Sequence, residues 1–103
     1  MYKIEVLPIA KKDIDETIYY ISHNLKNVSA AKKLRDLFIS SFDNIIEFPY
    51  IGTIYQSINT LKYKYRSYKI KNFIMFYIVD EKQKLITIVR VLYQKMDINN
   101  ILE

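Results

Sequence analysis

The sequence contains no cysteine, and this absence removes three kinds of chemistry at once. Disulfide bonds, thiolate zinc sites and a cysteine nucleophile all require that side chain. The chain also lacks a run of about 18 apolar residues, the length that a membrane span needs. Residues 1–16 carry acidic side chains and no long apolar stretch, unlike a signal peptide. We therefore expect a protein of the reducing cytoplasm without a membrane partner.

Glycine, proline and histidine are scarce as well, with one Gly, two Pro and one His. Half of the residues are hydrophobic and 26% are charged, which is typical of a globular chain. The length of 103 residues suits one compact domain, residues 1–103. His23 is expected at a helix end, where it would interact with the helix dipole. Asp13, Asp15 and Glu16 have no second acidic cluster that would complete a metal site, so we expect neither metal nor cofactor.

Acidic residues are missing from one long segment. Residues 1–47 hold as many acids as bases, so the net charge of +5 arises entirely after Phe48. No acid occurs between Glu47 and Asp80, and five basic residues interleaved with tyrosines lie there within ten positions: Lys62, Lys64, Arg66, Lys69 and Lys71. Such a segment suits a polyanion or an acidic protein, so these side chains are predicted to bind the target or nucleic acid. The alternative is a solvated edge strand protected by lysines.

The first half of the chain predicts a strand and two helices. Residues 2–7 alternate as a half-buried strand does and end at Pro8. Apolar residues spaced three or four apart then predict an amphipathic helix over residues 10–24. Ser29 is a candidate N-cap for a second helix that ends near residue 47, before Pro49. The two helices would form a hairpin, and residues 48–61 would form a loop.

The second half predicts three strands and a short terminal helix. Residues 63–70 are followed by a turn at Lys71–Asn72 and by residues 73–79, an apolar run expected of a central strand buried on both faces. Residues 85–93 are rich in β-branched side chains. Asp97 is a possible N-cap for the terminal helix. The predicted order is β-α-α-β-β-β-(α), an α+β domain with a helical hairpin packed on a mainly antiparallel four-stranded sheet.

Four motifs in this order resemble the RelE/ParE superfamily of toxins from bacterial type II toxin–antitoxin systems. The first helix reads P-x-A-x-x-D-I-x-x-x-x-x-Y-I from Pro8 to Ile21, and the second helix closes on I-x-x-F-P-x-x-G from Ile45 to Gly52. The sheet supplies Y-R-S-Y-x-I-x-N-F-x-x-F-Y-x-V-D over residues 65–80 and I-x-R-V-L-Y-x-K-x-D over residues 88–97. The resemblance covers nearly the whole chain and implies a toxin domain of that fold.

Two kinds of poison occur in that superfamily. Its ribosome-dependent mRNA cleavers typically carry an arginine where this chain has Ile74, and often a second one where it has Met96. Cleavage by the 2′-hydroxyl needs a base, an acid and positive charge beside the phosphate, so these two departures favour the other kind, ParE-like inhibitors of DNA gyrase. A toxin-fold remnant that binds only its antitoxin or DNA is a third possibility.

Four side chains would carry catalysis if the chain were RelE-like: Arg66, Arg90, Tyr93 and Lys95. Tyr93 would be the acid or base in that case, and packing under the terminal helix is its alternative role. Arg90 interrupts an apolar strand, so it must either reach a sheet surface or pair with an acid. Arg66 has a planar group suited to phosphate or carboxylate, or to an ion pair with a helix acid. Arg35 is expected on a solvated helix face.

The resemblance also implies partners. A cognate acidic antitoxin would neutralise the toxin, and the target would be DNA gyrase or, for the alternative, the ribosome with its mRNA. Operator DNA would be contacted only through the antitoxin. Charge steering by the basic segment favours an antitoxin segment that binds as a helix or strand across the sheet and the hairpin.

Overall fold

A computed structural model of the protein describes residues 1–56 and 63–102. The chain begins with strand β1 (Lys3–Val6), followed by helix α1 (Pro8–Tyr19), the π-helical turn η1 (Tyr20–Asn24) and helix α2 (Val28–Glu47). Strands β2 (Thr53–Ile54), β3 (Arg66–Ile70), β4 (Phe73–Asp80) and β5 (Leu85–Tyr93) come next, and helix α3 (Ile98–Leu102) closes the order.

The five strands form one sheet in the order β1-β5-β4-β3-β2. β1 runs parallel to β5, and the other neighbours are antiparallel. The α+β class and the mainly antiparallel sheet are thus confirmed, whereas the predicted number of four strands is wrong. The additional strand is β2, which lies in the segment predicted to be loop. Two residues are too few to show the alternation by which a strand is predicted.

Several element ends differ from the sequence prediction. α1 begins at Pro8, because the fixed φ of proline suits the first helical position. The N-cap of α2 is Asn27, whose Oδ1 accepts a hydrogen bond of 3.0 Å from the Ala30 amide, and not Ser29. β3 begins at Arg66, three residues later than predicted. The ends of α2 and β5 agree with the prediction.

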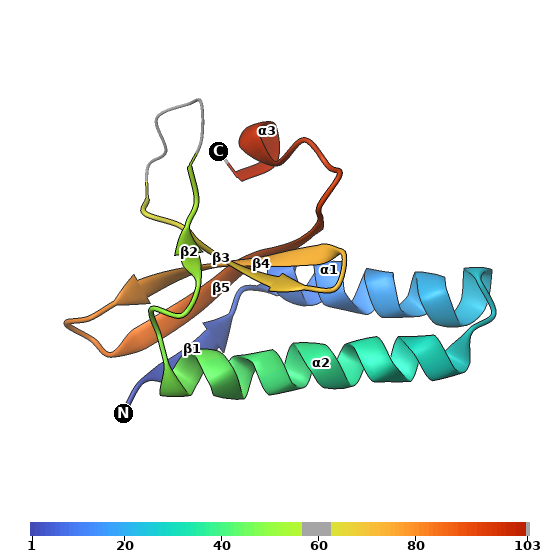
Figure 1. Cartoon of the computed structure of the whole chain (residues 1–103), viewed down its shortest axis with the longest axis horizontal. Coiled ribbons are helices and arrows are strands. Elements are labelled where there is room, and N and C mark those ends of the chain that lie inside the picture. The colour runs from blue at the N-terminus through green and yellow to red at the C-terminus, as the bar shows by residue number, and fades with distance from the viewer. Residues whose placement is uncertain (57–62, 103) are drawn as a thin grey trace.

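Helices cover both faces of the sheet (Figure 1). α1 and α2 lie side by side on one face, where they enclose the larger core with Met75 and Tyr77 of β4. α3 lies over the other face, where Ile98 and Leu102 pack with Phe76. β4 is therefore buried on both faces, as its apolar run predicts.

One carboxylate joins α1 to β5. Asp13 accepts hydrogen bonds from Nε of Arg90 at 2.8 Å and from Nη2 of Arg90 at 3.0 Å. Oδ2 of Asp13 also accepts one from the backbone amide of Val91 at 3.0 Å. In the described chain the pairing of β1 with β5 ends at Val6 and Ile88. Asp13 therefore takes over the hydrogen bonding of the β5 edge where β1 stops.

A second network holds the segment between α2 and β2. The buried hydroxyl of Tyr77 donates a hydrogen bond to the Pro49 carbonyl and accepts one from the Gly52 amide, both at 2.8 Å. A Cβ on Gly52 would lie 2.7 Å from that hydroxyl and 2.9 Å from the Ser67 carbonyl, so only glycine fits. Arg66, the cross-strand partner of Tyr77, donates to the Gly52 carbonyl at 2.7 Å. The F-P-x-x-G motif therefore has a structural role. We call the contacts of Tyr77 and Arg66 with Pro49 and Gly52 the clamp.

Removing the Asp13 carboxylate should destabilise the fold. The Asp13→Ala variant leaves the Arg90 guanidinium, whose side chain is only 22% exposed, and the Val91 amide without their acceptor. We expect the free energy of unfolding to fall by about 2–4 kcal/mol in urea denaturation. Asp15→Ala, which breaks only the exposed pair with Lys11, should change it by less than about 0.5 kcal/mol. Equal losses for the two variants would contradict this role of Asp13.

Tyr77 should leave a signature in alkaline solution. Burial raises the pKa of Tyr77 above its usual value. The folded state therefore keeps this proton at a pH where the unfolded chain, with a pKa of about 10, has lost it. The stabilisation is complete below that pH and is lost as the pH rises through the higher pKa of the folded state.

The Tyr77→Phe variant tests this expectation. It should be less stable than the wild type by about 1–3 kcal/mol at neutral pH, because the Pro49 carbonyl and the Gly52 amide lose their partner. The difference should shrink above about pH 10. Urea denaturation at several pH values measures it, and Tyr93→Phe is the control on a more exposed tyrosine. A difference that does not depend on pH would be inconsistent with a buried, neutral Tyr77 hydroxyl.

Candidate functional site

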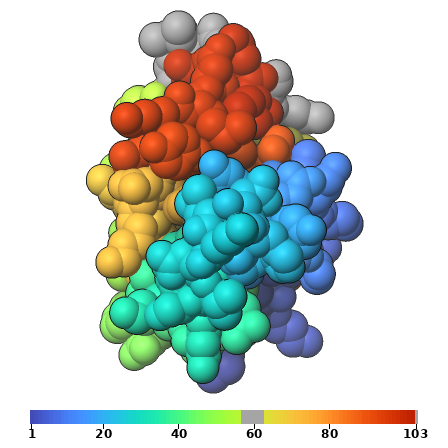
Figure 2. Space-filling view, turned by 90° about the vertical axis from the view of Figure 1, so that its right-hand side faces the viewer, coloured from blue at the N-terminus to red at the C-terminus, as the bar shows by residue number. Residues whose placement is uncertain are grey.

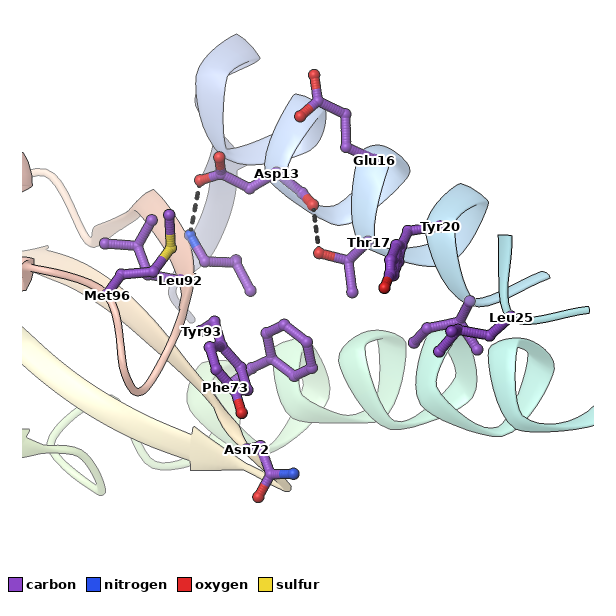
Figure 3. Close-up of a pocket in the computed structure, with 12 residues that line it drawn as sticks. Asp13, Glu16, Thr17, Tyr20, Leu25, Asn72, Phe73, Leu92, Tyr93 and Met96 are labelled. Atoms are coloured by element: carbon purple, nitrogen blue, oxygen red, sulfur yellow. Dashed lines mark hydrogen bonds between the residues drawn. The ribbon is translucent and has the colours of Figure 1, made fainter. Parts of the chain in front are cut away.

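A groove opens where the helical hairpin approaches the ends of the central strands (Figure 3). Its volume is about 640 Å³. α1 and η1 form one wall, and the end of β5 with the residues after it forms another. Most of the lining is apolar and includes Ile21, Leu25, Phe73, Leu92 and Met96. The groove can therefore hold an apolar segment of a partner.

Tyr93 lies at this groove and not under the terminal helix. Its ring packs edge-to-face on Phe73 with the ring centres 5.7 Å apart, and the residue remains 39% exposed. Figure 3 shows the two side chains next to each other on neighbouring strands. Lys95 is exposed in the turn that follows β5, beside Met96 in the groove wall. Both residues are accessible at the same end of the sheet.

The two candidate arginines are engaged within the fold. Arg90 is bound to Asp13, and these hydrogen bonds raise the pKa of the guanidinium. Arg66 binds the Gly52 carbonyl, and its guanidinium carbon lies 4.8 Å above the centre of the Tyr50 ring. The ion pair expected as one alternative for Arg90 is therefore present. Arg66 binds backbone carbonyls in place of the helix acid considered for it.

The basic segment does not present one continuous face. Lys62 lies outside the described residues, and Lys64 is exposed before β3 begins. Within β3, Arg66 pairs across with Tyr77 and lies on the face of α1 and α2, whereas strand alternation turns Lys69 to the opposite face. Lys71 is exposed in the turn after β3, with a φ of 55°. Of these cations, Lys71 adjoins the groove, because the next residue, Asn72, lines it.

Leu25 and Phe73 were absent from the candidates drawn from the sequence, although both line the groove. The sequence offered a signal for Leu25, since it continues the apolar spacing of the first helix. Phe73 opens an apolar strand and is indistinguishable there from the core residues around it. His23 stacks on Tyr19 with the ring centres 4.0 Å apart, at the exposed end of the hairpin.

The described residues offer neither a metal site nor a membrane-spanning helix. No group of three or more His, Cys, Asp or Glu side chains there could hold a metal ion. In the same part of the chain, no helix is both long enough and apolar enough to cross a membrane.

Most of the chain is similar to known proteins. A solved structure described as the chromosomal ParDE TA system from P. aeruginosa matches it with a TM-score of 0.69 and 16% sequence identity. The match covers 90% of this chain and 96% of that one, and at this identity it shows a shared fold. A comparison with curated protein sequences finds no match.

The family model of the ParE toxin of the type II toxin–antitoxin system, parDE, matches residues 4–98. This range includes the Asp13–Arg90 pair, the clamp around Tyr77 and all the residues that line the groove. The chain therefore belongs to the family of ParE toxins of type II toxin–antitoxin systems.

Proposed function

We propose that this toxin arrests bacterial growth in the cytoplasm by binding DNA gyrase and stabilising its complexes with cleaved DNA. The engagement of Arg66 and Arg90 within the fold is the observation that supports binding over RNA cleavage. Cleavage at a phosphate would need cations free to stabilise the extra negative charge of the transition state. Poisoning by surface complementarity has no such requirement.

The surroundings of Tyr93 support the same proposal. The neighbouring positions at which mRNA cleavers keep arginines hold Ile74, which packs in the smaller core, and Met96, which lines the groove. Lys95 remains as an exposed cation there, but a lysine offers a point charge and not a bidentate clamp. The alternative function, ribosome-dependent mRNA cleavage, would have to rely on Tyr93 and Lys95, with other flexible lysines supplying the positive charge beside the phosphate.

We further propose that a cognate acidic antitoxin neutralises the toxin by occupying the groove. The apolar lining would receive one face of an amphipathic helix or an extended strand. Lys71 and Lys95 adjoin the groove residues Asn72 and Met96 and would attract acidic side chains of that segment. Any operator DNA would then be contacted through the antitoxin.

Purified gyrase tests the function directly. Gyrase, supercoiled plasmid and ATP are incubated with the toxin, and cleaved DNA is released with detergent and protease. We expect linear DNA to accumulate with toxin concentration. Arg66→Ala should lower the yield, because the segment that Arg66 holds loses its position. Lys12→Ala, which affects an exposed pair with Glu16, serves as the control.

The absence of linear DNA at toxin concentrations that fully bind gyrase would contradict the proposal. If a folded Arg66→Ala variant traps as much cleaved DNA on gyrase as the wild type does, gyrase binding does not depend on the segment that Arg66 holds.

A further inference from the structure

A second segment without acids lies at the end of the helical hairpin. Between Glu16 and Asp36 the chain carries four basic residues and no acidic one: Lys26, Lys32, Lys33 and Arg35. All four are exposed. The ion pairs found among the described residues involve other cations: Lys11, Lys12 and Arg90. The end of the hairpin therefore carries positive charge that its own fold leaves uncompensated.

The π-helical turn changes which side chains this end exposes. The amide of Leu25 donates to the Tyr20 carbonyl five residues earlier, at 3.1 Å, so one extra residue is inserted into the helix. Leu25 would otherwise follow Ile14, Ile18 and Ile21 on the buried stripe. After the insertion Leu25 is 58% exposed, and Lys26 adopts a left-handed backbone with a φ of 51°. Such local irregularities persist where the surrounding structure, or a function, maintains them.

Large apolar side chains accompany the cations. Val28 is 70% exposed, Tyr19 60% and Leu25 58%. We call Tyr19, Leu25, Lys26, Val28 and Lys32 the hairpin tip. Figure 2 views the molecule from the side on which the hairpin ends, with the C-terminal segment above the hairpin. The tip is thus an exposed surface that combines apolar area with positive charge.

We infer that the hairpin tip is the surface by which the toxin docks on its target, and that it binds a protein surface with an apolar centre and a rim of carboxylates. This inference rests on the proposal that the toxin acts by binding a cellular protein. Charge complementarity selects the acidic partner, because the tip carries cations without acids. Exposed apolar side chains beside them supply the desolvated centre that protein interfaces need.

A protein fits this surface better than a nucleic acid does. Leu25 and Val28 offer aliphatic area, which the phosphate backbone does not bury. Binding to single strands uses aromatic rings with free faces, and His23 already covers one face of Tyr19. Leu25 also lines the groove, so an antitoxin bound there would cover part of the tip. Competition for Leu25 would then explain how the antitoxin keeps the toxin from its target.

The double variant Val28→Ser/Lys32→Glu tests the tip. Neither residue lines the groove. Serine suits Val28, the first residue of α2, and glutamate is a good helix former at Lys32 in the second turn. The matched control is Ile39→Ser/Lys12→Glu, which removes an exposed apolar residue of α2 and reverses an exposed lysine outside the tip. Each toxin is induced alone and with the neighbouring antitoxin gene, and growth, thermal unfolding and co-purification are measured. Trapping of purified gyrase on plasmid is measured in parallel.

We expect the tip variant to need at least about tenfold more toxin than the wild type for growth arrest and gyrase trapping. Its thermal unfolding and its co-purification with the antitoxin should be unchanged. The control should behave as the wild type does. Growth arrest by the tip variant at the wild-type level would overturn the inference. Loss of binding to bare duplex DNA in the same proportion as loss of arrest would also overturn it, in favour of a nucleic acid.

The same measurements distinguish a wrong target from a wrong docking surface. If wild-type toxin traps no gyrase but arrests growth, the target is another molecule, and the growth comparison still tests the tip. If wild-type and tip variant trap gyrase equally, gyrase remains the target and the tip is not its docking surface.

Discussion

The carboxylate of Asp13 joins the helical hairpin to the sheet. It binds the guanidinium of Arg90 and the amide of Val91, both on the strand at which β1 stops pairing. Without an acceptor at this position, β5 would leave an unpaired amide and a largely buried charge beside the middle of α1. Because α1 and η1 line the groove and lead into the hairpin tip, these hydrogen bonds link both surfaces to the sheet. Two residues far apart in the sequence, Asp13 and Arg90, therefore join the hairpin to the sheet.

Most arginines of this chain stabilise the fold. Two of the three arginines hold backbone segments in place: Arg90 through Asp13, and Arg66 through the Gly52 carbonyl beside the Tyr77 hydroxyl. Both cations are fixed by acceptors of the chain itself. The third arginine, Arg35, is exposed on α2, and lysines supply most of the remaining positive charge. The flexible, solvated side chains of lysine suit steering of an acidic partner better than clamping of a reacting phosphate. This division of labour agrees with a toxin that acts by binding.

The elements with a clear hydrophobic period could be predicted from the sequence, and those fixed by tertiary contacts could not. The stripes of the two helices and the apolar run of β4 are strong patterns, and they gave the class and most of the order. β2 is held by pairing with β3 and by the Tyr77 clamp, which a two-residue segment cannot reveal. The turn at Tyr20–Asn24 reads as ordinary helix, because a π-helical insertion has no residue signature. The basic residues of the candidate site are close together in the sequence, but strand alternation places Arg66 and Lys69 on opposite faces of the sheet. Asp13 stood in a recognised motif, yet its partner Arg90 could be identified only once the strand order was known.

We propose that the toxin poisons by binding and leaves RNA intact. The most direct measurement is the mapping of mRNA 5′ ends after purified toxin acts on translating ribosomes in a defined system. With Arg66 and Arg90 bound within the fold, we predict the same ends with and without toxin at concentrations that saturate gyrase trapping. New, site-specific ends that disappear with Tyr93→Phe would contradict the account and establish the mRNA-cleaving alternative.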